Sequence, residues 1–485
     1  MPDLNASLAL IAAIFMASAL ASALIERAPI SFPMIFLGLG FLLGPGALGI
    51  IAMDAHDRTL EAIATICLMF VLFLDAVSFE RDGSGRSWLT PVLALGPGTL
   101  LTIALVTLSA WALLNVPPIQ ALMLGTILSS TDAVVLRDVI RDRRLPGPVR
   151  EALKIEAGAN DLVVLPLLLV LIAVAQAQIS DLSSWLIFFG QVFIVGPVVG
   201  FAIGGIGSWL VGIADARMQI SRVYQSLFGV GLVLAAYASA VAFGGDGFLA
   251  AFAAGLAVVV FNRELCDCFL EYGEVTAEIA MLVAFVLFGA VLSSLIWQLP
   301  LGPVVGFSAL TIFIARPFAF GLVLMPARLS RAAHLFISWF GPRGLNSLLF
   351  ALLVVHSQLP FSEMLLAIVG VVVVMSVVAH GVTGTPLAHW YARQLENETL
   401  DEARESTATG LFQGAATDVP RITPRALSAA LESPEPPIVL DVHARPSRPG
   451  DQIGIPGSIS VPPDQVARWG AEQPSRGRLV VTYCT

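Results

Sequence analysis

Residues 152–178 read ALKIEAGANDLVVLPLLLVLIAVAQAQ, a long apolar run that contains Glu156 and the pair Asn160-Asp161. A helix needs about 20 predominantly apolar residues to cross the hydrocarbon core of a bilayer, so this run predicts a membrane span. Ionisable groups inside a span cost free energy and by default mark a pathway for ions or protons. The segment therefore predicts both a membrane fold and the place where function resides.

The composition of the whole chain agrees with repeated membrane crossing. Of its 485 residues, 57% are hydrophobic and only 13% are charged, whereas a soluble domain has about 25% charged residues. The predicted fold class is an all-α polytopic membrane protein embedded in a lipid bilayer. The charged residues that give the net charge of -9 are few, and we expect no nucleic-acid partner.

Apolar runs broken by charges or by Pro and Gly predict about 13 transmembrane helices. The arginines between the runs are biased: one set of alternate loops holds nearly all of them, and the other set holds only Arg58. Since cytoplasmic loops carry an excess of Lys and Arg, this bias predicts an N-terminus outside and a C-terminus in the cytoplasm. The runs lie near residues 6–25, 31–51, 60–79, 90–114, 118–140, 152–178, 184–212, 224–243, 246–262, 277–298, 302–326, 340–357 and 362–390.

Helix geometry separates the two carboxylates of the sixth span. Glu156 and Asn160 are four residues apart and share a face, while Asp161 points about 100° further round. A buried arginine needs an anion, so Arg316 in the eleventh span is expected to pair with Glu156. Asp132 in the fifth span and Asp161 are then the carboxylates expected to hold a hard monovalent cation, such as Na⁺, or protons.

Other interpretations of single residues stay open. Asp132 could cap a helix end near the cytoplasmic side, and Arg343 could only anchor the start of its span. Asp75 is expected to be interfacial because charged residues follow it closely. His356 and His380 are expected to be polar residues near span ends rather than proton sites.

The order of these motifs resembles the monovalent cation:proton antiporters of the sodium/proton exchanger type, over roughly residues 6–390. Asn160 in place of a second acid resembles the electroneutral branch of that family. The features that carry the resemblance are Leu43-Gly44-Pro45, Thr131-Asp132, Glu156-x-x-x-Asn160-Asp161, Arg316 and the Gly-x-Arg-Gly at 341–344.

The resemblance implies two inverted repeats, a core domain that moves against a dimerisation domain, and an ion site where two broken helices cross. It implies exchange of one cation for one proton across a bacterial cytoplasmic membrane by a homodimer, without a bound cofactor. Sodium is the expected cation, with lithium and potassium as alternatives.

The resemblance also assigns roles to residues of this chain. Asp161 would carry cation and proton in turn, and Asp132 and Thr131 would help to hold the cation, beside Asn160. Further candidates are Ser130 and Arg343, while Glu156 with Arg316 would brace the core.

Two positions depart from the family pattern. Ala133 stands where a proline commonly follows Thr-Asp, and Ala157 replaces a serine, which removes a hydroxyl ligand. Gly158 beside it could let water or backbone take that place. These departures bear on ion selectivity and stoichiometry.

After the last span the composition becomes polar, as in a soluble protein. We expect a transmembrane domain at 1–393, a cytoplasmic linker at 394–430, and at 431–485 a segment that resembles the start of a rhodanese-like module. Cys484 would be the catalytic residue of a complete module; only Thr485 follows it, so the module is expected to be incomplete and inactive.

Three other functions stay open at this point. One is a membrane-tethered sulfur transferase with Cys484 as nucleophile. Another is a transporter regulated by ligand binding to the tail. The third is an organic-anion symporter in which Arg343 binds the anion.

Overall fold

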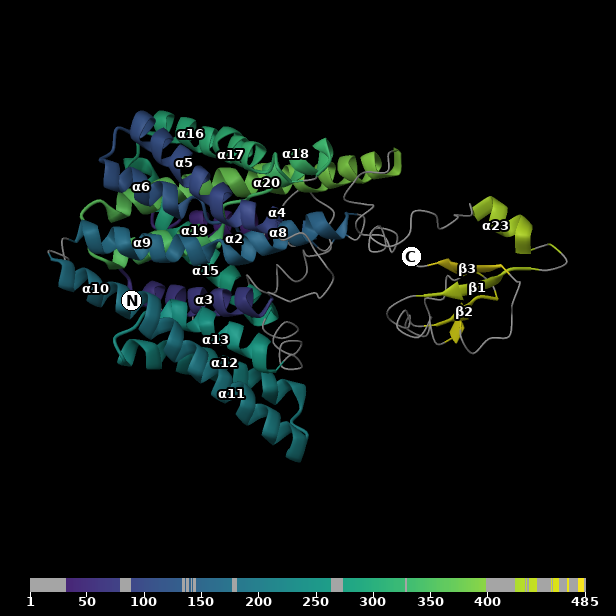
Figure 1. Cartoon of the computed structure of the whole chain (residues 1–485). Helices are drawn as coiled ribbons and strands as arrows, with labels where there is room; N and C mark the ends of the chain where they lie inside the picture. The colour runs from purple at the N-terminus through teal and green to yellow at the C-terminus, as the bar shows by residue number, and fades with distance from the viewer. Residues whose placement is uncertain are drawn as a thin grey trace. The chain divides into compact units, whose positions relative to one another are not determined.

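The computed structural model describes residues 32–78, 89–132, 136, 139–140, 142, 145–176, 181–262, 274–327, 329–397, 424–431, 433, 436–442, 455, 457–461, 469–470 and 479–483. The chain divides into two compact units, Met1–Ala403 and Arg404–Thr485. The first is helical and the second contains a small sheet, so the predicted class of a helical membrane protein with a partial α/β tail is confirmed (Figure 1).

Eight helical segments among the described residues are long and apolar enough to cross a membrane, and four shorter apolar helices accompany them. These correspond to the second to thirteenth predicted spans, while the first predicted span lies outside the described residues. The long segments are α3 (Arg58–Val77), α4 (Leu89–Leu93) with η1 (Ala94–Gly98) and α5 (Thr99–Leu114), α8 (Gly147–Ala159) with α9 (Asp161–Ala175), α10 (Leu182–Gly190) with η2 (Gln191–Val195) and α11 (Gly196–Met218), α12 (Arg222–Ala242), α15 (Glu274–Leu295) with η4 (Ile296–Gln298), α16 (Leu301–Leu310) with η5 (Thr311–Ala315) and α17 (Arg316–Val323), and α20 (Ser362–Asn397). The shorter helices are α2 (Phe32–Leu43), α6 (Pro118–Ile127), α13 (Gly247–Phe261) and α19 (Leu345–His356), and α18 (Arg331–Trp339) precedes the last of these.

The helices of the first unit pack into two groups. We call α2, α3, α11, α12, α13 and α15 the panel group, and α5, α6, α8, α9 and α16 to α20 the core group; contacts within each group are more extensive than those between them. In Figure 1, α11 to α13 lie on one side of the unit, and α16 to α18 with α20 lie on the other. The groups meet where α3 and α15 pack against α8, α19 and α20.

Small residues set the closest packing of the panel group. A Cβ added at Gly200 of α11 would lie 2.0 Å from the Ala250 carbonyl oxygen of α13, and one at Gly204 would lie 2.5 Å from the carbonyl oxygen of Ala254. In a membrane, where burial of apolar surface does not favour helix association, such close backbone approach supplies the van der Waals contact that does.

The core group contains two similar stretches of chain. A span with a π-helical turn at Ala94–Gly98 precedes α6, and a span with a π-helical turn at Thr311–Ala315 precedes α18 and α19. Pro97 lies in the first turn and Pro317 follows the second, and proline removes the backbone donor that an uninterrupted helix needs. The two stretches are seven spans apart in the chain, so they run in opposite directions, as inverted repeats do.

Each repeat contains a helix that breaks inside the membrane. After α6 the chain is non-helical at residues 129–132, and between α18 and α19 it is non-helical at 340–344. The Asp132 backbone N–H donates to the Pro342 carbonyl oxygen at 2.9 Å, so the breaks lie against each other. The expected crossing of two broken helices is present.

The second unit holds α23 (Pro424–Leu431) and a three-stranded parallel sheet of order β2-β1-β3. Its strands are β1 (Ile438–Asp441), β2 (Ile459–Ser460) and β3 (Val480–Tyr483), and Ile438 lies opposite Val480. The central strand is apolar and buried, as expected of a soluble α/β segment. Cys484 lies outside the described residues, so the likeness to a rhodanese module stays a prediction.

Candidate functional site

The sixth span brings three polar side chains into the membrane core. Glu156 lies on α8, Asp161 begins α9, and Asn160 between them keeps helical backbone angles of φ -65° and ψ -27°. All three residues are buried, with at most 1% of their surface exposed. Because the helix is continuous at Asn160, the carboxylates of Glu156 and Asp161 point to different partners, as the spacing predicted.

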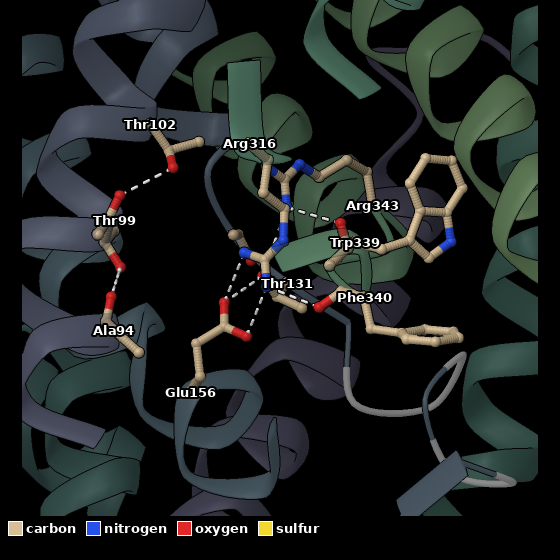
Figure 2. A network of polar contacts seen from close by, with 12 residues as sticks. Ala94, Thr99, Thr102, Thr131, Glu156, Arg316, Trp339, Phe340 and Arg343 are labelled. Atoms are coloured by element: carbon tan, nitrogen blue, oxygen red, sulfur yellow. Dashed lines mark hydrogen bonds and ion pairs between the residues drawn. The ribbon is translucent and has the colours of Figure 1, made fainter. Parts of the chain in front are cut away.

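The Glu156 carboxylate is neutralised by an arginine from the other repeat. Arg316 Nη1 and Nη2 donate to Glu156 Oε1 and Oε2 at 2.9 and 3.0 Å, and Nη2 also donates to the Phe340 carbonyl oxygen at 2.6 Å (Figure 2). The guanidinium carbon lies 3.9 Å from the centre of the Phe320 ring. This bidentate pair is the one that the sequence led us to expect, and it joins α8, α17 and the second break.

Thr131 and Arg343 extend this network. The Thr131 hydroxyl donates to Glu156 Oε1 at 2.8 Å, and Arg343 Nη1 donates to the Gly341 carbonyl oxygen at 2.9 Å and approaches Thr131 Oγ1 at 3.4 Å. Figure 2 shows Arg343 beside Arg316 and Thr131. Arg343 is only 2% exposed, and it lies two residues before α19, so it both precedes its helix and belongs to the buried network. Its backbone N–H also donates to Ser376 Oγ, at 2.7 Å.

Asp161 receives hydrogen bonds only from neutral groups in the part of the chain that the structure describes. Ser130 Oγ donates to its Oδ1 at 2.7 Å, and Asn346 Nδ2 donates to its Oδ2 at 2.8 Å. Ser130 belongs to the first break and Asn346 to the first turn of α19, after the second break. The carboxylate therefore lies at the crossing of the two broken helices.

Asp132 bonds to the opposite break. Its Oδ2 accepts a hydrogen bond of 2.7 Å from the Leu345 backbone N–H, at the beginning of α19. A carboxylate is stabilised at a helix N-terminus by free N–H groups and by the helix dipole. Asp132 is 2% exposed, and it caps the beginning of a helix of the other repeat.

Asp75, in the last turn of α3, is a further carboxylate near this site. Its Oδ2 atom is buried and has no hydrogen-bond partner among the described residues. A Cβ added at Gly158 of α8 would lie 3.9 Å from the Cβ of Asp75 on α3. Gly158 thus lies beside Asp75, so a panel-group carboxylate approaches the turn that precedes Asp161.

Three more buried polar groups were either not predicted from the sequence or predicted at a different place in their span. Asn346 was missed because an amide is not ionisable, although it follows the Gly-Pro-Arg-Gly motif directly in an otherwise apolar span. Ser376 was missed as a small hydroxyl. His380 is buried in α20, where Nδ1 lies 2.8 Å from the Ser376 carbonyl oxygen and Nε2 lies 3.2 Å from that of Trp339; it is not near a span end. His356 ends α19, as expected.

The oxygen atoms at the crossing are of the chemical type that binds a small cation. Both side-chain polar atoms of Asn160 are buried and have no hydrogen-bond partner among the described residues, as is true of Asp75 Oδ2. Hard monovalent and divalent cations take oxygen ligands. Glu156 is paired with Arg316, and the other carboxylates near the crossing are those of Asp161, Asp132 and Asp75, whose oxygen atoms are of the kind that bind cations or protons.

Comparisons with known proteins agree with this geometry. A family model described as "Sodium/hydrogen exchanger, transmembrane" matches residues 11–390. The chain is 29% identical to the K(+)/H(+) antiporter NhaP of Alkalimonas amylolytica, over 82% of this chain and 69% of that protein. It is 28% identical to the K(+)/H(+) antiporter NhaP2 of Shewanella oneidensis, over 80% of this chain and 67% of that protein.

A solved structure shows the same fold. The sodium proton antiporter MjNhaP1 from Methanocaldococcus jannaschii at pH 8 superposes with a TM-score of 0.66 at 20% identity, covering 81% of this chain and 100% of that chain. At this identity the likeness bears on the fold alone. It agrees with the inverted repeats and crossed broken helices described above.

Proposed function

The chain belongs to the sodium/hydrogen exchanger family, and on that premise we propose that it exchanges one monovalent cation for one proton by competition at Asp161. Membership makes it a multi-pass membrane transporter of cations and protons rather than an enzyme. The proposal adds the residue that couples the two movements, the stoichiometry and the ion.

The partners of Asp161 carry the proposal. The carboxylate is 1% exposed and is held by Ser130 and Asn346, which donate to its two oxygens but bring no charge. A buried carboxylate without a counter-charge is strongly disfavoured, so either a cation or a proton must neutralise it. Because a bound proton removes the charge that attracts the cation, the two ligands exclude each other, and this exclusion couples their transport.

The other acids are less suited to carry the proton. Glu156 is paired with Arg316, and breaking that pair would leave an uncompensated buried charge. Asp132 accepts the Leu345 N–H and so acts in holding the two breaks together. Asn160, beside Asp161, is a neutral amide that cannot bring a second proton. In this proposal Asp161 alone carries the proton, which gives an electroneutral exchange of one cation for one proton.

We propose sodium as the cation, held by Asp161, Asp132, the Thr131 backbone and Asn160. The Thr131 hydroxyl donates to Glu156, so in this proposal Thr131 binds the ion through its backbone carbonyl. Asp75, near Gly158, adds a further carboxylate. The names of the two relatives make potassium the direct competitor of sodium, with lithium as a further alternative.

We also propose the setting in which exchange takes place. The arginine bias of the loops supports a cytoplasmic membrane location with the N-terminus outside and the C-terminus in the cytoplasm. The homodimer stays a proposal from family resemblance.

The experiment is an ion screen on the purified full chain in liposomes that contain a pH-sensitive dye. Sodium, lithium and potassium are added in turn to an outside medium of constant osmolarity. We expect sodium to move protons with the lowest half-saturating concentration, and the rate to be unchanged when a membrane potential is imposed with a permeant anion. If only potassium moves protons, the transported cation is potassium and not sodium. If the rate changes with the membrane potential, the one-to-one stoichiometry is contradicted.

A further inference from the structure

Three side chains of residue types that commonly bind metals lie close together at the N-terminal end of α20. Asp54 and His56 come from the turn between α2 and α3, and Glu363 is the second residue of α20. Their ligand atoms all lie within 4.8 Å of one another, and His56 Nδ1 lies 3.2 Å from Glu363 Oε1. None of these residues takes part in the ion site at Asp161.

The backbone on both sides of the cluster is held in place, while the side chains are free to adjust. The Asp57 N–H donates to the Asp54 carbonyl oxygen at 3.1 Å and closes the turn, and Ala55 within it is only 1% exposed. The side chains of His56 and Glu363 are 37% and 44% exposed. A metal ion could thus be reached from water and bound without unfolding either segment.

We propose that Asp54, His56 and Glu363 bind a divalent transition-metal ion of the zinc type. Zinc takes nitrogen and oxygen ligands at about 2.0–2.2 Å, which puts neighbouring ligand atoms of a tetrahedron roughly 3.3–3.6 Å apart. The observed 3.2 Å between His56 Nδ1 and Glu363 Oε1 is close to that separation. Three protein ligands would leave a coordination position for water.

The ligand set distinguishes among metals. Calcium and magnesium prefer oxygen ligands alone, whereas imidazole together with carboxylates suits zinc and its neighbours in the first transition row. A simple ion pair of protonated His56 with Glu363 would account for two of the residues. It would not account for Asp54, which places a second carboxylate against the same imidazole.

The site would join the two helix groups. Asp54 and His56 precede α3 of the panel group, and Glu363 lies on α20 of the core group, so one metal ion would bond to both. This step rests on the proposed function and on the movement of a core domain against a dimerisation domain that the family resemblance implies. If the two helix groups move in that way, a metal ion here would hold them together at this face and slow exchange. Metal binding itself does not depend on that function.

Binding is tested by calorimetric titration of zinc into the purified full chain in metal-free buffer. We expect one zinc ion per chain, and His56→Gln and Glu363→Gln should each weaken binding by at least about 10-fold. The control is His389→Gln, which removes an exposed histidine toward the other end of α20 and should bind like the unchanged protein. The site is overturned if the unchanged chain binds no zinc, if His56→Gln binds it equally well, or if His389→Gln loses as much.

The effect on transport is tested in liposomes with zinc on both sides. Zinc should slow exchange severalfold in the unchanged protein, and exchange by His56→Gln should not respond. Zinc that binds without slowing exchange contradicts the bridging role. If the unchanged protein exchanges no cation at all, the proposed function fails, and the titration alone still decides whether the metal site exists.

Discussion

The Leu345 backbone N–H donates a 2.7 Å hydrogen bond to Oδ2 of Asp132, a residue 213 positions earlier in the chain. This bond joins the break of one repeat to the first turn of the helix that follows the break of the other. It gives Asp132, one of the two aspartates at the crossing, a structural role. Among the described residues Asp161 is held by the neutral donors Ser130 and Asn346, and in the proposed mechanism it is the acid that changes partner between a cation and a proton.

The ion pair of Glu156 and Arg316 should stabilise the fold more than it affects ion binding. Both side chains are 2% exposed, and removing one member of a buried pair typically costs about 3–5 kcal/mol because the other charge is left uncompensated. We expect Glu156→Gln and Arg316→Gln each to lower the melting temperature of the purified protein, and the double variant to recover part of the loss. Two single variants as stable as the unchanged protein would show that the pair contributes nothing.

Gly344 should be intolerant of any side chain. A Cβ at this position would lie 1.8 Å from Asp132 Oδ2, closer than atoms can approach, so Gly344→Ala should separate the two breaks and abolish exchange. The matched control is Gly306→Ala on α16, where a Cβ would have no atom within 4 Å; it should exchange normally. The two are compared by exchange rate and by melting temperature. Normal exchange by Gly344→Ala would contradict the close contact of the breaks.

Asn346 should set cation affinity through its bond to Asp161. A hydrogen bond to a charged group contributes about 1.5–3 kcal/mol, which corresponds to a roughly tenfold or larger change in affinity. We expect Asn346→Ala to raise the half-saturating cation concentration by about that factor. Its neighbour Ser347 donates instead to the Ile127 carbonyl oxygen at 3.2 Å, so Ser347→Ala should leave the affinity nearly unchanged. If the two variants have equal cation affinities, Asn346 does not contribute to cation binding.

Hydropathy and charge together predicted much of this architecture. Apolar runs located the spans, because each helix must satisfy its backbone hydrogen bonds within the bilayer. The pairing of Arg316 with Glu156 followed from the need of a buried guanidinium for an anion. The crossing of two breaks came from family resemblance rather than from the residues, since no local pattern states which helices meet.

What the sequence did not predict has physical causes. Asn346 is uncharged, so a prediction built on ionisable groups does not include it. The place of Arg343 beside Thr131 depends on the non-helical backbone at 340–344, which no local pattern predicts. The burial of Asp75 Oδ2 depends on how α3 packs against its neighbours, which the position of Asp75 in its span does not reveal.

Asp161→Asn tests the central claim most directly. The amide keeps the shape of the carboxylate but cannot titrate, so the purified variant should fold, as judged by its melting temperature, and should exchange no cation for protons in liposomes. The control is Asp246→Asn, which changes a carboxylate that accepts the Leu249 N–H at the start of α13, away from the site, and it should exchange like the unchanged protein. Exchange of sodium for protons by folded Asp161→Asn would contradict the account.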